Sequence, residues 1–362
     1  MKLSSFSYYT DSFGIVTKED YVVRTKVSKI GTLVIKEKAG LSIFVYCKEL
    51  YFVIGDSHMI QPFKLGYADI VTKDIEAMEH YYMDVMGHTL VEKGDNGKRY
   101  LSTGLDHHNI ILTPSDRSNL QCIGFQLGNQ YLLHDVKRQL EERGISVQLK
   151  SDARPGLPEM LELEDPDGFI VHLYTDMETP APHFKENGIV PNKLGHLALG
   201  SIKPKKSVAF YREALNFHYT DRIGDRANFI TCNADHHVLN ISNLGQLVGR
   251  PVMYHIAFEL LDASHQYRSL DILAKNNIPT IWGPTRHTAG HNIAAYHHDP
   301  DGNLVELFID MDQLLPEVGY FEPRPWHEEL PLKARHWEDN AAWGTGYEKT
   351  LFEYALQKYQ NQ

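Results

Sequence analysis

Hydrophobic and polar residues follow the same order of predicted elements twice along the chain. Each time a short apolar strand comes first, and a segment with apolar residues at helical spacing follows it. Runs rich in β-branched and aromatic residues come next, then a second amphipathic helix, and a DPDG turn leads into a closing strand. The expected helices span about 74–86 and 133–143 in the first copy and about 205–215 and 262–275 in the second. The pattern predicts an α+β fold made of βαβββ-like units.

The two copies also correspond residue by residue. KLGYADI at 64–70 corresponds to KLGHLAL at 193–199, which lies 129 residues later, and RYLSTGLDHHNIIL corresponds to NFITCNADHHVLNI at the same offset. The two DPDG turns lie 134 residues apart, so only a few residues have been inserted within the repeat. We therefore predict two tandem modules, at 63–178 and 190–312, each built of paired βαβββ units.

The segments outside the repeat have a different composition. Residues 1–62 contain several strand-like runs and form a β-rich N-terminal extension, while a polar, proline-rich link at 178–192 separates the modules. The tail at 313–362 carries Trp326, Trp337 and Trp343 together with proline and glycine, so we expect irregular structure that wraps over a surface. Both ends of the chain are expected to serve oligomer contacts or to cover a pocket.

Charge and composition exclude several classes of function. The 362 residues include 36 Lys+Arg and 47 Asp+Glu, a net charge of −11, which argues against nucleic acid or an anionic membrane as partner. No apolar run is long enough to span a membrane, and the N-terminus lacks the apolar core of a secretory signal. The three cysteines lie far apart, which argues against a disulfide scaffold or a cysteine zinc site. These features predict a cytoplasmic protein.

The chain has 20 histidines, and comparing the copies separates a few of them from the rest. Three predicted strand positions differ in chemistry between the modules: Tyr67 corresponds to His196, Cys122 to His255 and His172 to Glu306. A single strand histidine is more often a hydrogen-bonded core or surface residue than a ligand. Three correlated changes that leave His, His and Glu in one module instead indicate the facial triad typical of non-haem Fe(II) oxygenases. The first-module residues are expected to be ordinary core and surface residues, with no second metal.

Several motifs in the second half of the chain resemble one enzyme family. They are GHLAL (195–199), YHIAFEL (254–260), GPTRH (283–287), HN (291–292), YHHDPDGNLVELF (296–308) and PRPWHEELP (323–331). Together they resemble the type I extradiol catechol dioxygenases of the vicinal oxygen chelate superfamily. The resemblance covers about 64–331 and implies the vicinal oxygen chelate fold, also described as the glyoxalase/bleomycin resistance/dioxygenase fold, in both modules.

The resemblance also implies an activity. An enzyme of this kind inserts both atoms of O2 into a catechol beside the diol and gives a ring-opened product of the hydroxymuconic semialdehyde type. His196, His255 and Glu306 would bind Fe(II), with Mn(II) as an accepted alternative. The partners implied are a catecholic substrate, O2 and further copies of the chain in a dimer or tetramer.

Further site residues follow from the same resemblance. The family's acid/base histidine corresponds to His237, with the neighbouring His236 as fallback and as a substrate contact. The first module also contains a DHH segment, so this pair could partly reflect strand structure that both copies inherited. His287 and Tyr296 match positions that hydrogen-bond the substrate or bound oxygen, and Asn292 is a further candidate for substrate binding.

Three alternatives remain at this point. A glyoxalase-like isomerase shares the scaffold, but such enzymes assemble one site from ligands on two modules. A 4-hydroxyphenylpyruvate dioxygenase-like enzyme also uses His, His and Glu in its second half, yet it has no need for the DHH and GPTRH segments. A non-catalytic protein that binds aromatic compounds has no reason to keep a complete triad. The particular catechol, the cleaved bond and the choice of Fe or Mn stay open.

Overall fold

The computed structural model divides the chain into two compact units, Met1–Met59 and Ile60–Gln362. It describes residues 15–16, 26–27, 31–36, 42–47, 50–51, 59–180, 187–315, 320–322, 335–344 and 349–360. In the first unit, β1 (Ile15–Val16) runs parallel to β3 (Gly31–Lys36), which pairs antiparallel with β4 (Ser42–Cys47). A second pair joins β2 (Lys26–Val27) to β5 (Leu50–Tyr51). These strands lie in the segment whose composition predicts β structure.

The first module of the second unit is a sheet of eight strands in the order β11-β12-β13-β10-β6-β9-β8-β7. Its strands are β6 (Pro62–Thr72), β7 (Thr89–Lys93), β8 (Arg99–Ser102), β9 (Ile110–Pro114), β10 (Asn119–Leu127), β11 (Gln148–Arg154), β12 (Leu157–Glu164) and β13 (Ile170–Tyr174). The helical segments are α1 (Ile75–His80), its continuation η1 (Tyr81–Val85) and α2 (Leu133–Glu142). Each half of the sheet is therefore one strand, one helical segment and three further strands.

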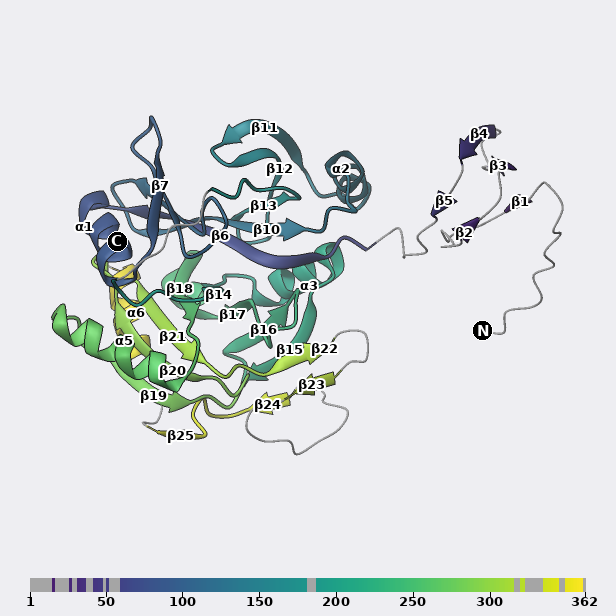
Figure 1. Ribbon diagram of the computed structural model, residues 1–362. Helices are drawn as coiled ribbons and strands as arrows, with labels where there is room; N and C mark the ends of the chain where they lie inside the picture. Colours follow the sequence, from purple (N-terminus) through teal and green to yellow (C-terminus); the bar gives the residue numbers. More distant parts are fainter. Residues whose placement is uncertain are drawn as a thin grey trace. The chain divides into compact units, whose positions relative to one another are not determined.

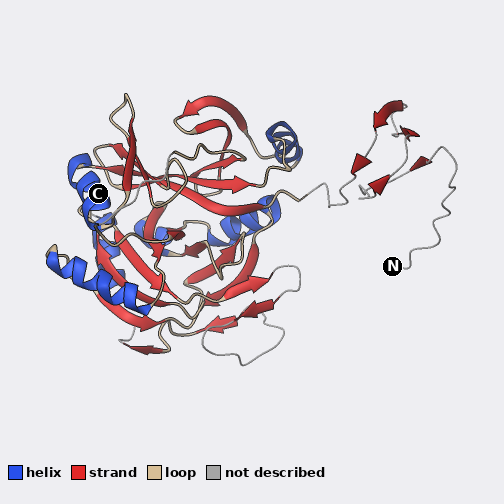
Figure 2. Cartoon of the chain, viewed as in Figure 1, coloured by secondary structure: helices blue, strands red, loops and turns tan. Residues whose placement is uncertain are grey.

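The second module repeats this plan in a sheet of ten strands, in the order β24-β15-β16-β17-β14-β18-β21-β20-β19-β25. Its repeat strands are β14 (Lys193–Gly200), β15 (His218–Ile223), β16 (Ala227–Thr231), β17 (Leu239–Ser242), β18 (Val252–Glu259), β19 (Trp282–Arg286), β20 (Ile293–His298) and β21 (Leu304–Ile309). Helices α3 (Pro204–Leu215) and α5 (Ala263–Lys275) follow the first strand of each unit, and α4 (Leu244–Val248) follows β17. Figures 1 and 2 show the strands of both modules as curved layers with the helices beside them. The predicted α+β class and the paired βαβββ units are confirmed.

Local sequence signals explain where several of these elements begin. Asp74 caps α1 by accepting a hydrogen bond from the amide of Ala77, and Asp262 caps α5 in the same way through His265. In both DPDG turns the final glycine has a positive φ, +91° at Gly168, which lets the chain reverse into the closing strand.

The two modules share one hydrophobic core, and their contacts are related by the repeat. The ring of Tyr82 in η1 lies 6.3 Å from that of Phe258 in β18, and the ring of Tyr211 in α3 lies 6.3 Å from that of Phe125 in β10. Tyr211 is the repeat equivalent of Tyr82, and Phe258 is that of Phe125. The first helical segment of each module thus packs against a central strand of the other module. These reciprocal contacts fix the second sheet relative to the first.

The tail differs from its prediction. Instead of being irregular throughout, it contains α6 (Lys349–Gln360), which packs its buried Ala355 and Tyr359 against Leu244 and Val252. Two short tail strands, β24 (Arg335–Trp337) and β25 (Trp343–Gly344), extend the two edges of the second sheet, and β22 (Gln313–Leu315) pairs with β23 (Tyr320–Glu322). The apolar face of α6 finds a matching surface only in the folded module, so composition alone did not predict the helix. Trp326 lies outside the described residues.

No helix among the described residues combines the length and the apolar character needed to cross a bilayer.

His297 is fully buried, although it lies next to the DPDG turn. Its Nε2 lies 2.7 Å from the hydroxyl oxygen of Tyr81 in the first module. Burial, with His298 beside it, lowers the pKa of His297 to about 3.

This buried imidazole makes stability depend on pH. The unfolded side chain takes up a proton near pH 6.5 and the folded one only near pH 3, so its contribution is full above pH 6.5 and is lost as the pH falls. We expect the wild-type free energy of unfolding to fall about 2 kcal/mol further than that of His297→Gln between pH 7.5 and 5. Urea denaturation across this range measures the difference, and parallel curves for the two proteins would contradict it.

Candidate metal centre

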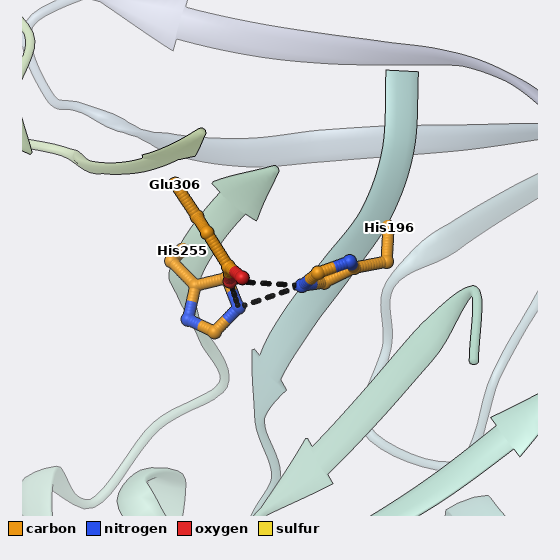
Figure 3. A group of neighbouring side chains, drawn as sticks. All are labelled: His196, His255 and Glu306. Atoms are coloured by element: carbon orange, nitrogen blue, oxygen red, sulfur yellow. Dashed lines mark hydrogen bonds and ion pairs between the residues drawn. The ribbon is translucent and has the colours of Figure 1, made fainter. Parts of the chain in front are cut away.

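Three adjacent strands of the second module carry the predicted ligands. His196 lies on β14, His255 on β18 and Glu306 on β21, and these strands are neighbours in the sheet. All three side chains are buried and point toward one another (Figure 3). The triad is the one group of three or more His, Cys, Asp or Glu among the described residues whose ligand atoms lie within 4.8 Å of one another.

The backbone around His196 explains its direction. Leu194 pairs with Phe258 and His196 with Ala257, so Gly195 is the extra residue of a β-bulge. A Cβ atom at this glycine would lie 2.5 Å from the ring of Phe308, whose centre is 5.1 Å from that of His196. Glycine before the histidine therefore allows an aromatic ring to support the imidazole.

The three ligand atoms fit a cation better than they fit one another. Nε2 of His196 lies 3.0 Å from Oε2 of Glu306 and 3.2 Å from Nε2 of His255, which is itself 3.2 Å from the same carboxylate oxygen. No placement of protons turns all three contacts into hydrogen bonds, because a carboxylate only accepts and two N–H groups repel each other. The Nδ1 atoms of both histidines are buried and lack a hydrogen-bond partner. One divalent cation would accept all three lone pairs.

The charges favour the state that binds metal. Burial by itself would raise the pKa of Glu306, but His196 and His255 hold that pKa well below its usual range. Burial lowers the pKa of His255, so its imidazole stays neutral. A carboxylate and neutral imidazoles are the protonation states that a metal requires of these ligands.

Asn292 supports the carboxylate from behind. Its Nδ2 donates a hydrogen bond of 2.8 Å to Oε1 of Glu306, which leaves Oε2 directed at the two histidines. Asn292 is fully buried and does not line the cavity described below. This amide therefore contacts the triad itself, and its contact with substrate stays a prediction.

The DHH segment places one histidine at the triad and one behind it. The ring centre of His237 lies 4.3 Å from that of His196. Nδ1 of His237 is 3.0 Å from Nδ1 of His236, and Nε2 of His236 is 3.1 Å from Oδ2 of Asp221 on β15. Burial, with His196 and His236 nearby, holds the pKa of His237 well below its usual range. His236 thus lies between His237 and Asp221, and its contact with substrate stays a prediction.

An aromatic wall faces the triad from β19 and β20. The rings of Trp282 and Tyr296 stack 5.0 Å apart, and His287 stacks 5.3 Å from Trp282. The hydroxyl of Tyr296 lies 3.3 Å from Nε2 of His287, and Tyr296 is the cross-strand neighbour of Glu306. Burial lowers the pKa of His287 to about 4, so this histidine is neutral near pH 7.

These groups line a cavity of about 320 Å³. His196, His237, His255, His287, Tyr296 and Glu306 occupy one part of it. The remaining lining is supplied by Ile223, Arg226, Ala227, Phe229, Asn240, Ser242, Asn243, Tyr254, Trp282, Leu304, Asn340, Phe352 and Glu353. The cavity walls are mostly apolar and aromatic, which suits a flat organic molecule placed against the triad.

The tail completes this cavity with Asn340 and with Phe352 and Glu353 of α6. The sequence predicts that the tail covers a pocket, but it does not single out these residues, because their positions depend on the docking of α6. Asp221 was also missed, although the sequence carried a signal for it. Glu92, exactly one repeat earlier at the 129-residue offset, is also a carboxylate.

The equivalent positions of the first module form a different cluster. The Tyr67 hydroxyl lies 2.6 Å from Nδ1 of His172, the Cys122 sulfur lies 3.1 Å from the same nitrogen, and Nε2 of His172 pairs with Glu162 at 3.0 Å. All three equivalent residues are buried, whereas some were expected at the surface. Their polar atoms form hydrogen bonds with one another, in contrast to the three ligand atoms that converge in the second module.

The geometry predicts a specific cost for loss of the Asn292 amide. We expect Asn292→Ala to weaken divalent metal binding about 10- to 100-fold, because the carboxylate loses the hydrogen bond that orients it. Anaerobic calorimetric titration with Mn(II) measures this affinity. His172→Gln, at the repeat equivalent of Glu306, is the matched control and should bind metal as the wild type does. Equal affinities for Asn292→Ala and the wild type would contradict the prediction.

Comparison with known proteins finds metal-dependent enzymes that are similar to this chain. A manganese-dependent 2,3-dihydroxybiphenyl 1,2-dioxygenase of Geobacillus genomosp. 3 is 24% identical over 285 residues, covering 73% of this chain and 90% of the relative. Residues 193–307 match the family model of the Glyoxalase/Bleomycin resistance protein/Dioxygenase superfamily. The matched segment contains all three residues of the triad.

Solved structures of the same fold are equally informative. The 2,3-dioxygenase LapB from Pseudomonas sp. KL28 superimposes with a TM-score of 0.66 at 23% identity, covering 74% of this chain and 98% of that one. The Mn(II)-bound glyoxalase from Novosphingobium aromaticivorans gives a TM-score of 0.67 at 25% identity, over 79% and 92% of the two chains. The chain therefore has the vicinal oxygen chelate fold, and residues 193–307 of its second module are similar to domains of the Glyoxalase/Bleomycin resistance protein/Dioxygenase superfamily.

Proposed function

We propose that the protein is an extradiol ring-cleaving dioxygenase that opens a catechol beside its diol and uses both atoms of O2. The observation that carries this proposal is a complete His-His-Glu triad at one end of an aromatic-lined cavity. The similarity to a 2,3-dihydroxybiphenyl 1,2-dioxygenase supports the same reaction class. The product would be of the hydroxymuconic semialdehyde type.

The proposed cofactor is Fe(II), with Mn(II) as an accepted alternative. Two imidazole nitrogens and one carboxylate oxygen suit either ion, and they leave further coordination positions for a diol and O2. When bound, the ion would supply Lewis acidity that lowers the pKa of the diol hydroxyls, and it would hold both reactants side by side. His196, His255 and Glu306 are the proposed ligands.

His237 is the proposed acid/base. A diol that enters the cavity must lose a proton, and a proton must return to the reacting oxygen later. His237 lines the cavity beside His196, and its Nδ1 is taken up by His236, so Nε2 is the nitrogen directed to the substrate side. His236 holds His237 in place, and its contact with the substrate stays a prediction.

His287 and Tyr296 are proposed to act on the opposite wall. The Tyr296 hydroxyl lies on the strand that pairs with the Glu306 strand, and its contact with His287 fixes the direction of the O–H group. Together they present a neutral hydrogen-bonding pair where oxygen atoms of the reactants gather. Stacked against Trp282, both rings are held still, so the pair is preorganised.

A glyoxalase-like isomerase is the second candidate, because the structural match to a Mn(II)-bound glyoxalase is as good as that to the dioxygenase. The position of all three triad residues in one module argues against it.

Oligomeric state and cytoplasmic location stay predictions. The described cysteines Cys122 and Cys232 are free and buried, which suits a reducing compartment.

The experiment that separates the candidates is anaerobic reconstitution with Fe(II) or Mn(II), followed by a panel of catechols in air. We expect a yellow ring-opened product with one O2 consumed for each catechol, and no such product from Glu306→Ala. Isomerisation of a glutathione-type hemithioacetal without O2 uptake, together with no yellow product from any catechol, would overturn the proposal.

His237 gives a second prediction. His237→Asn should lower kcat about 10²- to 10⁴-fold, the usual contribution of a positioned acid/base, while metal affinity stays within about 3-fold of the wild type. His108→Asn, at the equivalent position of the first module, is the control and should keep wild-type kcat. Steady-state O2 uptake measures both variants. Full activity in His237→Asn would remove this residue from the mechanism.

A further inference from the structure

We propose that Asp221 is a positioning residue that acts through His236 to fix the tautomer of His237, so that Nε2 of His237 carries no proton and faces the cavity as the proton acceptor. The inference rests on the proposed function for its kinetic consequence, but the tautomer itself does not depend on turnover. It adds a residue outside the cavity to the machinery of the site.

The chain of contacts starts from a carboxylate. Oδ2 of Asp221 lies 3.1 Å from Nε2 of His236, and the indole N–H of Trp337 donates to the same oxygen at 3.0 Å. Nδ1 of His236 then lies 3.0 Å from Nδ1 of His237. Asp221, His236 and His237 are all buried, so bulk solvent has little access to these bonds.

With both imidazoles neutral, the carboxylate of Asp221 fixes the direction of each hydrogen bond. A carboxylate oxygen only accepts, so Nε2 of His236 must carry the proton. Nδ1 of a neutral His236 is then a lone pair and accepts a hydrogen bond from Nδ1–H of His237. Nε2 of a neutral His237 is left as the bare nitrogen. The Asp221 carboxylate, acting through His236, thereby determines which nitrogen of His237 faces the substrate.

The first module contains the same histidine pair with a more distant and more exposed carboxylate beside it. Nδ1 of His107 lies 3.0 Å from Nδ1 of His108, at the equivalent positions. The carboxylate one repeat before Asp221 is Glu92, which lies 3.4 Å from Nε2 of His107 and is 44% exposed, whereas the Asp221 side chain is 2% exposed. The histidine pair therefore belongs to the inherited strand geometry, and the short, buried anchor belongs to the module that carries the triad.

The tail builds the anchor. β24 pairs parallel with β15, with Arg335 opposite Asp221, and this places Trp337 where its indole N–H reaches the carboxylate. Trp337 also packs against the ring of His291, whose Nδ1 lies 2.6 Å from Oδ2 of Asp312. The first sheet has no described strand in the corresponding place, where β7 forms the sheet edge. The tail thus contributes to the proposed chemistry as well as to the cavity wall.

The direct test reads the tautomer by ¹⁵N NMR of histidine-labelled, metal-free protein, with His237→Gln used to assign the signals. We expect a protonated, pyrrole-type Nδ1 and a bare, pyridine-type Nε2 for His237 in the wild type. The opposite pattern, with the proton on Nε2, would overturn the proposal by itself, whatever the variants do and whether or not any catechol is cleaved.

Two variants then connect the tautomer to catalysis. Asp221→Leu removes the acceptor at similar size, so His237 should lose its single tautomer and kcat should fall about 10²-fold or more, with KM for the catechol within about 3-fold. Asp221→Asn should keep the tautomer and most of kcat, because the Trp337 N–H selects the amide oxygen for the shared position. Glu92→Leu is the matched control and should match the wild type.

The outcomes separate the possible explanations. A large loss of kcat in Asp221→Asn with the tautomer unchanged would mean that the charge acts and the tautomer does not, which overturns the proposal. Wild-type kcat in a folded Asp221→Leu would also overturn it. Absence of catechol cleavage by the wild type would count against the proposed function alone, since the NMR measurement still decides the tautomer.

Discussion

The rest of this structure depends on three buried ligand atoms that cannot all satisfy one another with hydrogen bonds. They are the ligand atoms of His196, His255 and Glu306, which lie 3.0–3.2 Å apart, and a divalent cation would bind all three. The surrounding elements hold these three side chains in position. Three adjacent strands fix the spacing, the bulge at Gly195 turns one imidazole inward, and Asn292 fixes the carboxylate.

The repeat shows what was needed to make such a centre. Both modules have the same units, the same paired histidines and the same type of turn before the closing strand. In the first module, Tyr67, Cys122 and His172 donate and accept among themselves, which gives a stable polar core. In the second, the side chains at the same positions cannot all satisfy one another with hydrogen bonds. A shared scaffold thus supports either a satisfied core or a centre that requires an ion.

Sequence comparison between the copies predicted the fold class and the triad residues because strand register is inherited with the backbone. A residue that faces the centre of one sheet has an equivalent that faces the centre of the other, so changes in chemistry stand out. Contacts that depend on packing between elements do not follow from this comparison. Asn292 contacts Glu306, His236 contacts Asp221, and α6 packs on a surface that only the folded module provides.

The tail contributes to both the fold and the site, because it extends the sheet, lines the cavity and donates a hydrogen bond to Asp221.

The central claim is that this centre directs both atoms of O2 into one catechol. The most direct measurement is mass spectrometry of the product formed by metal-loaded enzyme under ¹⁸O2, with the product reduced at once so that its carbonyl oxygen cannot exchange with water. The account predicts two labelled oxygens in each ring-opened molecule. A ring-opened product with no label from O2, or conversion of substrate without O2, would contradict it.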